Sequence, residues 1–214
     1  MLAFRKVVFF GAHTDDEMVA AGTLHRLVRQ GAEVHVVTFS PAGTKDDRRG
    51  GPESSRVVYA EWNESMREIG AVRSEFHNLT PSVDLRPFGQ VIADTIFQYI
   101  EFHQPDAAFI LSPDDENPAH AVVGVESERV MRGRVATVLR CHFPYNYTIG
   151  RPNLFVQLDR SDVDCKRRVI DCYRSQHWRY GYEQMLLSYA EADALAVKAG
   201  TSHVEKFEVI RSVV

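Results

Sequence analysis

The sequence of 214 residues predicts an α/β fold, with one domain over residues 1–214 and a mostly parallel central sheet. Apolar runs of strand length alternate with amphipathic stretches of helix length, and this alternation is typical of right-handed βαβ units. The length suits one α/β domain with a sizeable core. No internal repeat or low-complexity linker divides the chain, which supports a single domain.

The expected elements follow one another along the chain. Residues 6–11 are mostly apolar and predict a buried strand, and residues 16–30 predict a helix closed by Gly31. The next helix starts at Glu53 or Ser54 and ends before Gly70. The other expected strands are residues 34–39, 74–79, 107–111, 135–141, 154–158 and 207–210. The other expected helices are residues 88–103, a segment from Pro118 onward, 162–175 and 184–198.

Composition limits the functions open to the chain. With 44% hydrophobic and 25% charged residues it is an ordinary globular sequence, and its net charge of −4 gives no general attraction to nucleic acid or anionic lipid. No apolar run is long enough to span a bilayer, and no signal-peptide pattern precedes the first strand. The three cysteines lack a CxxC spacing, so we expect reduced thiols, a cytoplasmic location and no membrane partner.

The segment His13-Thr14-Asp15-Asp16-Glu17 follows the first predicted strand directly. Bare carboxylates beside a buried strand are costly unless they are paired or bound to a cation. One imidazole with oxygen ligands suits a divalent metal such as Zn²⁺, and a spare carboxylate can act as a base. The alternative is helix capping by Thr14 or Asp15, with the other acids in the first turn. Capping explains the acids but leaves His13 without a role.

A second acidic loop, residues 112–117, follows the fourth predicted strand, and His120 comes shortly after it. Ligands of parallel sheets bind beyond the carboxyl ends of the strands. The two loops therefore lie at the same edge of the predicted sheet, and both bring a histidine and acidic groups. We expect them to meet around one ion.

These residues resemble a known family. Residues Gly11 to Glu17 are similar to the AHPDDE motif of the LmbE-like / PIG-L zinc-dependent de-N-acetylases, which remove N-acetyl groups from amino sugars. The family's D-x-H-P-D-H element aligns with Asp115-Glu116-Asn117-Pro118-Ala119-His120. Weaker similarities are Glu61, Lys166 with Ser175-Gln176, and Glu205-Lys206-Phe207. The resemblance spans about residues 5–208 and implies a Rossmann-like three-layer sandwich.

The resemblance also implies roles for individual residues. His13, Asp16 and His120 match the metal ligands, and Asp15 matches the general base for attack of a metal-activated water on the amide. Two nitrogens and one carboxylate leave a position open on zinc, as catalysis requires, although the same set can hold Fe²⁺. The implied substrate is a small N-acetylated amino sugar or sugar conjugate.

The sequence departs from the family at several positions. Asn117 stands where a histidine usually stabilises the oxyanion or donates a proton, and Ala119 replaces an aspartate that orients that histidine. An amide N–H can still bind an oxyanion, but it is not an acid. We therefore expect Asp15 to carry out both proton transfers, or His142 to fill the vacancy from the loop after the fifth strand. Val58 replaces the arginine that the family usually has one turn before Glu61, so we expect this chain to bind its substrate through other residues.

The loop over residues 40–51 is rich in glycine and basic residues. Lys45, Arg48 and Arg49 are candidates to bind a phosphate or carboxylate of the substrate. The alternative is an ordinary solvated loop. Aromatic residues can line a sugar pocket or pack in the core, and these candidates are Tyr145, Tyr147 and residues 178–180.

Two rival functions stay open on the sequence alone. Asn117 and Ala119 can mark a weak family member that binds a metal and a glycan without efficient turnover. The parallel sheet can also bind a nucleotide, but the turn after the first strand lacks a glycine-rich phosphate cradle, and its acids would repel a pyrophosphate. The sequence does not choose between a monomer and a homo-oligomer.

Overall fold

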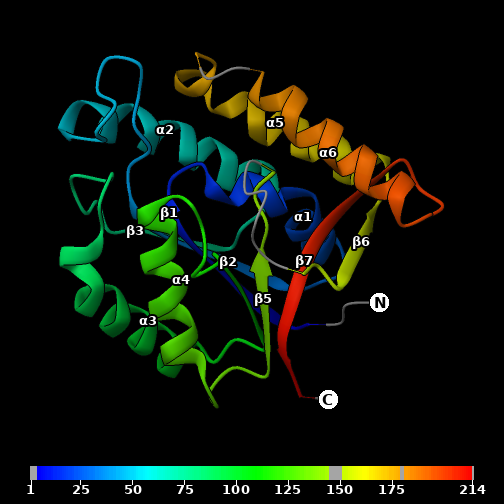
Figure 1. Cartoon of the computed structure of the whole chain (residues 1–214), viewed down its shortest axis with the longest axis horizontal. Helices are drawn as coiled ribbons and strands as arrows, with labels where there is room; N and C mark the ends of the chain where they lie inside the picture. Colours follow the sequence, from blue (N-terminus) through cyan, green and yellow to red (C-terminus); the bar gives the residue numbers. More distant parts are fainter. Residues whose placement is uncertain (1–3, 145–150, 179–180, 214) are drawn as a thin grey trace.

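A seven-stranded sheet in the order β3-β2-β1-β4-β5-β7-β6 runs through the middle of the molecule (Figure 1). It is seen in a computed structural model that describes residues 4–144, 151–178 and 181–213. The strands are β1 (Lys6–His13), β2 (Glu33–Ser40), β3 (Arg73–Phe76), β4 (Ala107–Ile110), β5 (Thr137–Cys141), β6 (Leu154–Leu158) and β7 (His203–Ser212). Strands β1 to β5 pair in parallel, whereas β7 is antiparallel to both of its neighbours. The predicted mostly parallel sheet is confirmed.

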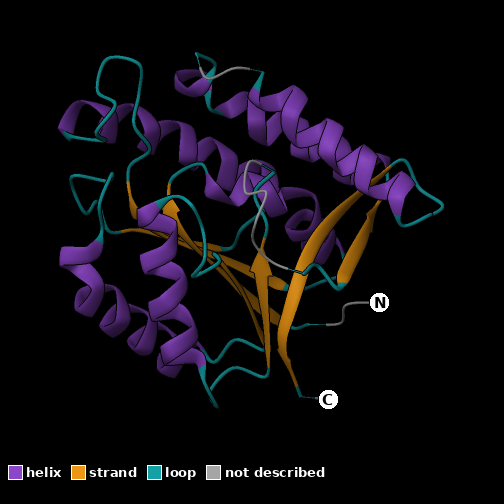
Figure 2. Ribbon diagram, viewed as in Figure 1, coloured by secondary structure: helices purple, strands orange, loops and turns teal. Residues whose placement is uncertain are grey.

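Helices cover both faces of the sheet and complete three layers (Figure 2). Helices α3 (Gly89–His103) and α4 (Pro118–Met131) lie on one face. The other face carries α1 (Ala21–Arg29), α2 (Pro52–Ile69), α5 (Arg160–Cys172) and α6 (Tyr182–Ala196). Three short 3-10 helices are η1 (Asp16–Ala20), η2 (Arg86–Phe88) and η3 (Arg174–Gln176). The predicted α/β three-layer fold is confirmed.

Strands β1 and β4 lie side by side in the centre of the core. Residues Val7–Phe10 of β1 and all four residues of β4 are fully buried, which their apolar sequences allow. The strand order reverses here, because β2 pairs with one edge of β1 and β4 with the other. Such a reversal leaves a crevice beyond the carboxyl ends of the two strands. The fold therefore places His13 and the loop after Ile110 at the two sides of one crevice.

Some element boundaries differ from the sequence predictions. The helix expected over residues 16–30 is divided into η1 and α1. Strand β3 stops at Phe76, where its pairing with β2 ends, and the left-handed Asn78 follows at φ 53°. Strand β7 is ten residues long because it pairs with β5 on one side and β6 on the other, so its position inside the sheet was not apparent from the short predicted strand.

The described residues contain neither a membrane-spanning helix nor a paired cysteine. Within the described ranges, none of the helices combines the length and apolar character needed to cross a bilayer. Cys141, Cys165 and Cys172 are buried free thiols, as expected from their spacing.

Helix α4 approaches the loop after β4 very closely at Gly124. A Cβ atom there would lie 2.6 Å from the backbone nitrogen of Pro113 and 2.6 Å from the backbone carbon of Ser112. These are backbone atoms, so the contact is relieved only if the helix or the loop moves. Since α4 carries His120 and the loop carries Asp115, this contact also sets the spacing of the candidate site.

Gly124→Ala should therefore destabilise the protein by about 1–3 kcal/mol through overpacking, as measured by urea unfolding. Gly89→Ala is the matched control, because Gly89 is helical and its Cβ would meet only the flexible Glu126 side chain at 3.3 Å. The control should change stability by no more than about 0.5 kcal/mol. Equal stabilities of the two variants would contradict the close approach.

Candidate metal centre and active site

The Asp16 carboxylate folds the turn after β1 back onto the strand. Its Oδ2 atom accepts hydrogen bonds from the backbone N–H groups of Ala12 (2.7 Å) and His13 (2.8 Å). The other oxygen, Oδ1, lies 3.1 Å from Nε2 of His120 and 3.7 Å from Nδ1 of His13. The backbone bonds therefore aim one carboxylate oxygen at the two imidazoles.

The start of helix α4 fixes His120. Asn117 caps the helix by accepting a hydrogen bond from the Ala119 backbone N–H at 3.0 Å, and Pro118 occupies its first turn. The Nδ1 atom of His120 lies 3.1 Å from Oδ2 of Asp115, which can only accept a hydrogen bond when ionised. This contact assigns one proton to Nδ1, so Nε2, which faces Asp16, is the atom that gains or loses the second proton.

The tautomer of His13 follows from its own contact. Its Nε2 atom lies 3.1 Å from the backbone oxygen of Ser82 and must be the donor there. The lone pair of Nδ1 then faces Nε2 of His120 across 3.1 Å, and in the neutral form of His120 that atom also carries a lone pair. Two lone pairs and a carboxylate oxygen repel one another unless a proton or a cation lies among them.

The three candidate ligand atoms fit a divalent cation. One ligand atom from each of His13, Asp16 and His120 lies within 4.8 Å of the others. Two imidazole nitrogens and one carboxylate oxygen form a donor set that zinc accepts while keeping a free position. Asp115 and Ser82 orient the two imidazoles from behind, as the outer partners of metal-bound histidines generally do.

The charged groups of this cluster shift one another's pKa values. Burial alone would lower the pKa of His120, but the carboxylates of Asp16 and Asp115 outweigh it and raise that pKa to about 10. Burial alone would raise the pKa of Asp16, but His120 and His13 hold it well below its usual range. The cluster is thus built to stabilise positive charge at its centre.

A cavity of about 570 Å³ opens over this cluster. Asp15, which is 3% exposed, lines it beside the candidate ligands. Its lining residues are His13, Asp15, Asp16, Ala42, Gly43, Arg48, Ser82, Val83, Glu116, Asn117, Pro118 and His120. Residues from both predicted loops therefore share one cavity, as the sequence analysis expected.

The three consecutive acids of the first motif have separate environments. Asp15 holds the N-cap position of η1 but makes no side-chain capping hydrogen bond, so the capping alternative does not account for it. Thr14 instead accepts a hydrogen bond from the Ala42 backbone N–H at 3.1 Å. Glu17 is buried in the core, where burial raises its pKa to about 8, and it accepts hydrogen bonds from Ser65 and Tyr173.

His142 lies apart from this cavity. Its side chain is 5% exposed and lines a separate pocket of about 30 Å³ together with Lys166, Asp193 and Lys206. Burial lowers the pKa of His142, and its Nε2 atom has no hydrogen-bond partner among the described residues. The structure therefore brings Asn117 to the candidate cavity but does not bring His142 there.

Of the three basic candidates in the loop over residues 40–51, Arg48 alone lines the cavity. Its guanidinium lies 5.1 Å from the ring centre of Trp178, a cation–π contact between two distant segments. Lys45 and Arg49 are exposed and are not among the lining residues. The aromatic candidates Tyr145, Tyr147 and Tyr180 lie outside the described residues.

Sequence reasoning missed two residues that orient the ligands. Asp115 belongs to the segment that resembles the family element, and its place five residues before His120 on one acidic loop is the signal that points to its role. Ser82 acts through its backbone oxygen, which leaves no trace in the residue type. Trp178 was considered as a pocket residue, but its contact with Arg48 depends on the tertiary fold.

Solved structures with this fold include enzymes of more than one kind. N,N'-diacetylchitobiose deacetylase from Pyrococcus horikoshii, complexed with its inhibitor MPG, is 20% identical with a TM-score of 0.74, covering 97% of this chain and 84% of that one. The zinc-inhibited form of teicoplanin deacetylase Orf2 is 14% identical with a TM-score of 0.77, covering 97% and 98%. GalB, the 4-carboxy-2-hydroxymuconate hydratase from Pseudomonas putida KT2440, is 19% identical with a TM-score of 0.78, covering 98% of each chain. At these identities the likeness shows the shared fold.

Sequence comparison is more specific. Curated protein sequences gave no match. The family model PIG-L, described as GlcNAc-PI de-N-acetylase, matches residues 8–131. That range is more than half of the chain and contains both motifs of the cavity, from His13 to His120. The chain therefore belongs to the PIG-L (LmbE-like) family of de-N-acetylases.

Proposed function

We propose that this protein is a metal-dependent N-deacetylase that hydrolyses the N-acetyl group of an amino sugar or sugar conjugate, with zinc as its metal. The observation that carries the proposal is the cluster of His13, Asp16 and His120 beside Asp15 in one cavity. The family match over residues 8–131 supports the reaction class. The same fold also serves a hydratase, so the family and the site, rather than the fold, select hydrolysis.

The side chains divide the chemistry among themselves. A zinc ion held by His13, Asp16 and His120 would supply Lewis acidity, polarising the amide carbonyl and lowering the pKa of water. Asp15 accepts a proton from the attacking water and returns it to the nitrogen of the departing amine. The new carbon–oxygen bond forms, the carbon–nitrogen bond breaks, and acetate and a free amine leave.

Asn117 takes the place of an oxyanion donor in this proposal. Its Oδ1 atom is used by the Ala119 backbone N–H, so the NH₂ group is the part of the amide left for a ligand in the cavity. That group can donate a hydrogen bond to the tetrahedral oxyanion but cannot supply a proton. Because His142 lines a different pocket, Asp15 performs both proton transfers.

The cavity also suggests how the rest of the substrate binds. Arg48 is the proposed contact for a polar or anionic group of the substrate, since it lines the cavity and is held by Trp178. Lys45 and Arg49 would then act only at longer range. The three buried free thiols support a reducing, cytoplasmic location.

Asp16→Ala should abolish metal binding, whereas Asp15→Ala should keep the metal and lose acetate release. Loss of a general base typically costs about 10²–10⁴-fold in rate. Metal content by elemental analysis and acetate release from a panel of N-acetylated amino sugars measure the two properties. Asp114→Ala is the control, because Asp114 is an exposed acid of the loop after β4 and does not line the cavity. Loss of the metal from Asp15→Ala would make Asp15 a ligand, and a wild type that binds no divalent metal would falsify the proposal.

Zinc binding should release about one proton near neutral pH. The pKa of His120 is raised to about 10 in the metal-free protein, so the imidazole is protonated below that pH and must lose its proton before it can bind zinc. The apparent affinity should therefore rise about tenfold per pH unit between about pH 6 and 8. Calorimetry in buffers of different ionisation enthalpy counts the released protons. An affinity that does not change with pH would contradict the assigned ligand set.

His142→Ala should keep wild-type turnover, because the side chain does not line the cavity. Asn117→Ser should keep the helix cap and lower kcat, by about 10²–10³ if the amide is the oxyanion donor. Steady-state acetate release with the metal bound measures both variants. A large loss of kcat in His142→Ala, with Asn117→Ser unaffected, would reverse the two roles.

A further inference from the structure

A buried lysine holds the turn that follows the metal-binding aspartate. Lys166 of α5 is 2% exposed, and its ammonium group donates to the backbone oxygens of Met18 (2.7 Å) and Val19 (3.1 Å). The third hydrogen bond goes to Oε1 of Glu205 at 2.5 Å. All three donors of the ammonium group are therefore used.

Glu205 of β7 holds the next segment of the same turn. Its Oε1 accepts a hydrogen bond from the backbone N–H of Gly22 at 3.1 Å, and its Oε2 accepts one from Thr23 at 2.7 Å. These are the first amides of α1, which have no partners inside the helix. A carboxylate is also favoured there by the helix dipole.

The pair thus fills a break in the backbone hydrogen bonding. Helix η1 ends and α1 begins within residues 18–23, so carbonyl oxygens and amide groups are both left without helical partners in a buried place. Lys166 donates hydrogen bonds to the carbonyl oxygens, and Glu205 accepts hydrogen bonds from the amide groups. Buried ion pairs add little net stability compared with apolar side chains of similar size. Here, however, apolar side chains would leave these buried carbonyl and amide groups without partners, so the two charges fix the backbone geometry of the junction.

The junction lies directly after the candidate metal site. Asp16 is the first residue of η1, and the backbone oxygen of Asp15 closes the first turn by accepting a hydrogen bond from the Met18 backbone N–H at 3.3 Å. At its start, the turn is held by the hydrogen bond from the β1 backbone to the Asp16 carboxylate. At its end, it is held by the contacts of Lys166 and Glu205. A shift of the far end would tilt both acids in the cavity.

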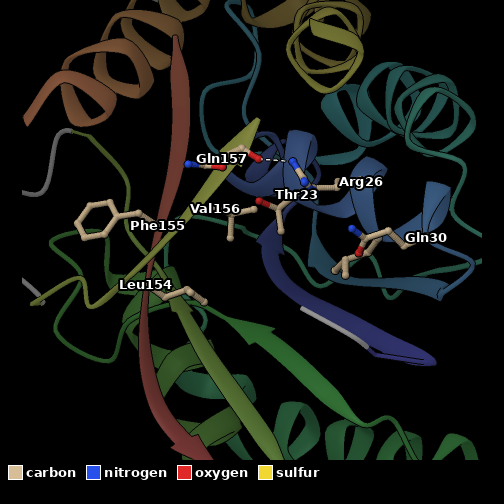
Figure 3. A pocket seen from close by; sticks show the side chains of 8 residues that line it. Thr23, Arg26, Gln30, Leu154, Phe155, Val156 and Gln157 are labelled. Atoms are coloured by element: carbon tan, nitrogen blue, oxygen red, sulfur yellow. Dashed lines mark hydrogen bonds between the residues drawn. The ribbon is translucent and has the colours of Figure 1, made fainter. Parts of the chain in front are cut away.

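Packing along α1 is uneven. A cavity of about 440 Å³ separates part of α1 from β6, lined by Thr23, Arg26, Leu27 and Gln30 on the helix side (Figure 3). Arg26 bridges this gap with a hydrogen bond to the backbone oxygen of Gln157 at 2.5 Å (Figure 3). The N-terminal end of α1 is held both by the close packing of Gly22 against Leu158 and by the hydrogen bonds of its amides to Glu205.

We propose that Lys166 and Glu205 are positioning residues for the metal centre, which hold the η1–α1 junction in the geometry that places Asp15 and Asp16 in the cavity. This inference rests on the proposed function, since it assigns the pair to that site. The pair itself does not line the cavity over the metal cluster. Its effect therefore passes through the backbone of residues 16–23.

Lys166→Met and the double variant Lys166→Met/Glu205→Gln test the proposal. The single variant leaves the Glu205 carboxylate buried without its ion-pair partner. The double variant removes both charges and is the one to measure if the single variant does not fold. Both should bind zinc at least about tenfold more weakly and lose at least about tenfold in kcat, because small misplacements of reacting groups are costly. In the metal-free protein, hydrogen exchange at the Gly22 and Thr23 amides should become faster.

Arg29→Met is the matched control on the same helix. Arg29 joins the C-terminal end of α1, opposite the junction, to Asp159 (2.8 Å) and Asp162 (3.0 Å) at the start of α5. It should change urea stability without changing zinc affinity, kcat or exchange at Gly22 and Thr23. Wild-type zinc affinity and kcat in folded Lys166 variants would overturn the positioning role while leaving the proposed function intact. Failure of the wild type itself to bind zinc would instead sink the proposed function.

Discussion

The Asp16 carboxylate is the interaction on which the candidate site depends. One of its oxygens is bound by two backbone amides at the end of β1, and this fixes the direction of the other oxygen toward both imidazoles. The carboxylate thereby ties the buried strand β1 to α4, more than 100 residues later along the chain. This one side chain therefore binds the backbone of β1, offers a ligand oxygen and supplies the negative charge beside the two imidazoles.

The topology explains why such a link forms here. Since β1 and β4 are neighbours where the strand order reverses, the loops that follow them face each other across a crevice. The close approach of Gly124 to the loop after β4 sets the distance between α4 and that loop. Asp115 and the Ser82 backbone oxygen then fix the orientations of the His120 and His13 imidazoles. The two neighbouring acids have different surroundings: Glu17 lies in the core, and Asp15 lines the cavity. The Lys166–Glu205 pair binds the backbone of the η1–α1 junction, which follows these acids.

Local pattern predicted most of the fold and the chemical groups at the site. The apolar run of β1, the acids after it and the loop before His120 all carry signals within a few residues. Three features depend on long-range structure instead. Strand β7 lies between β5 and β6 because of pairing over more than 40 residues. The Ser82 contact uses a backbone oxygen. His142 follows β5, where adjacent side chains point to opposite faces, so a shift of one residue decides which pocket it lines.

The central claim is that two distant loops bind one cation through three named atoms. A crystal structure of the zinc-loaded protein with anomalous scattering data tests it most directly. The account predicts one strong zinc peak within about 2.0–2.2 Å of His13 Nδ1, Asp16 Oδ1 and His120 Nε2. A peak at other side chains, or a His120 imidazole turned out of bonding range of the bound zinc, would contradict it.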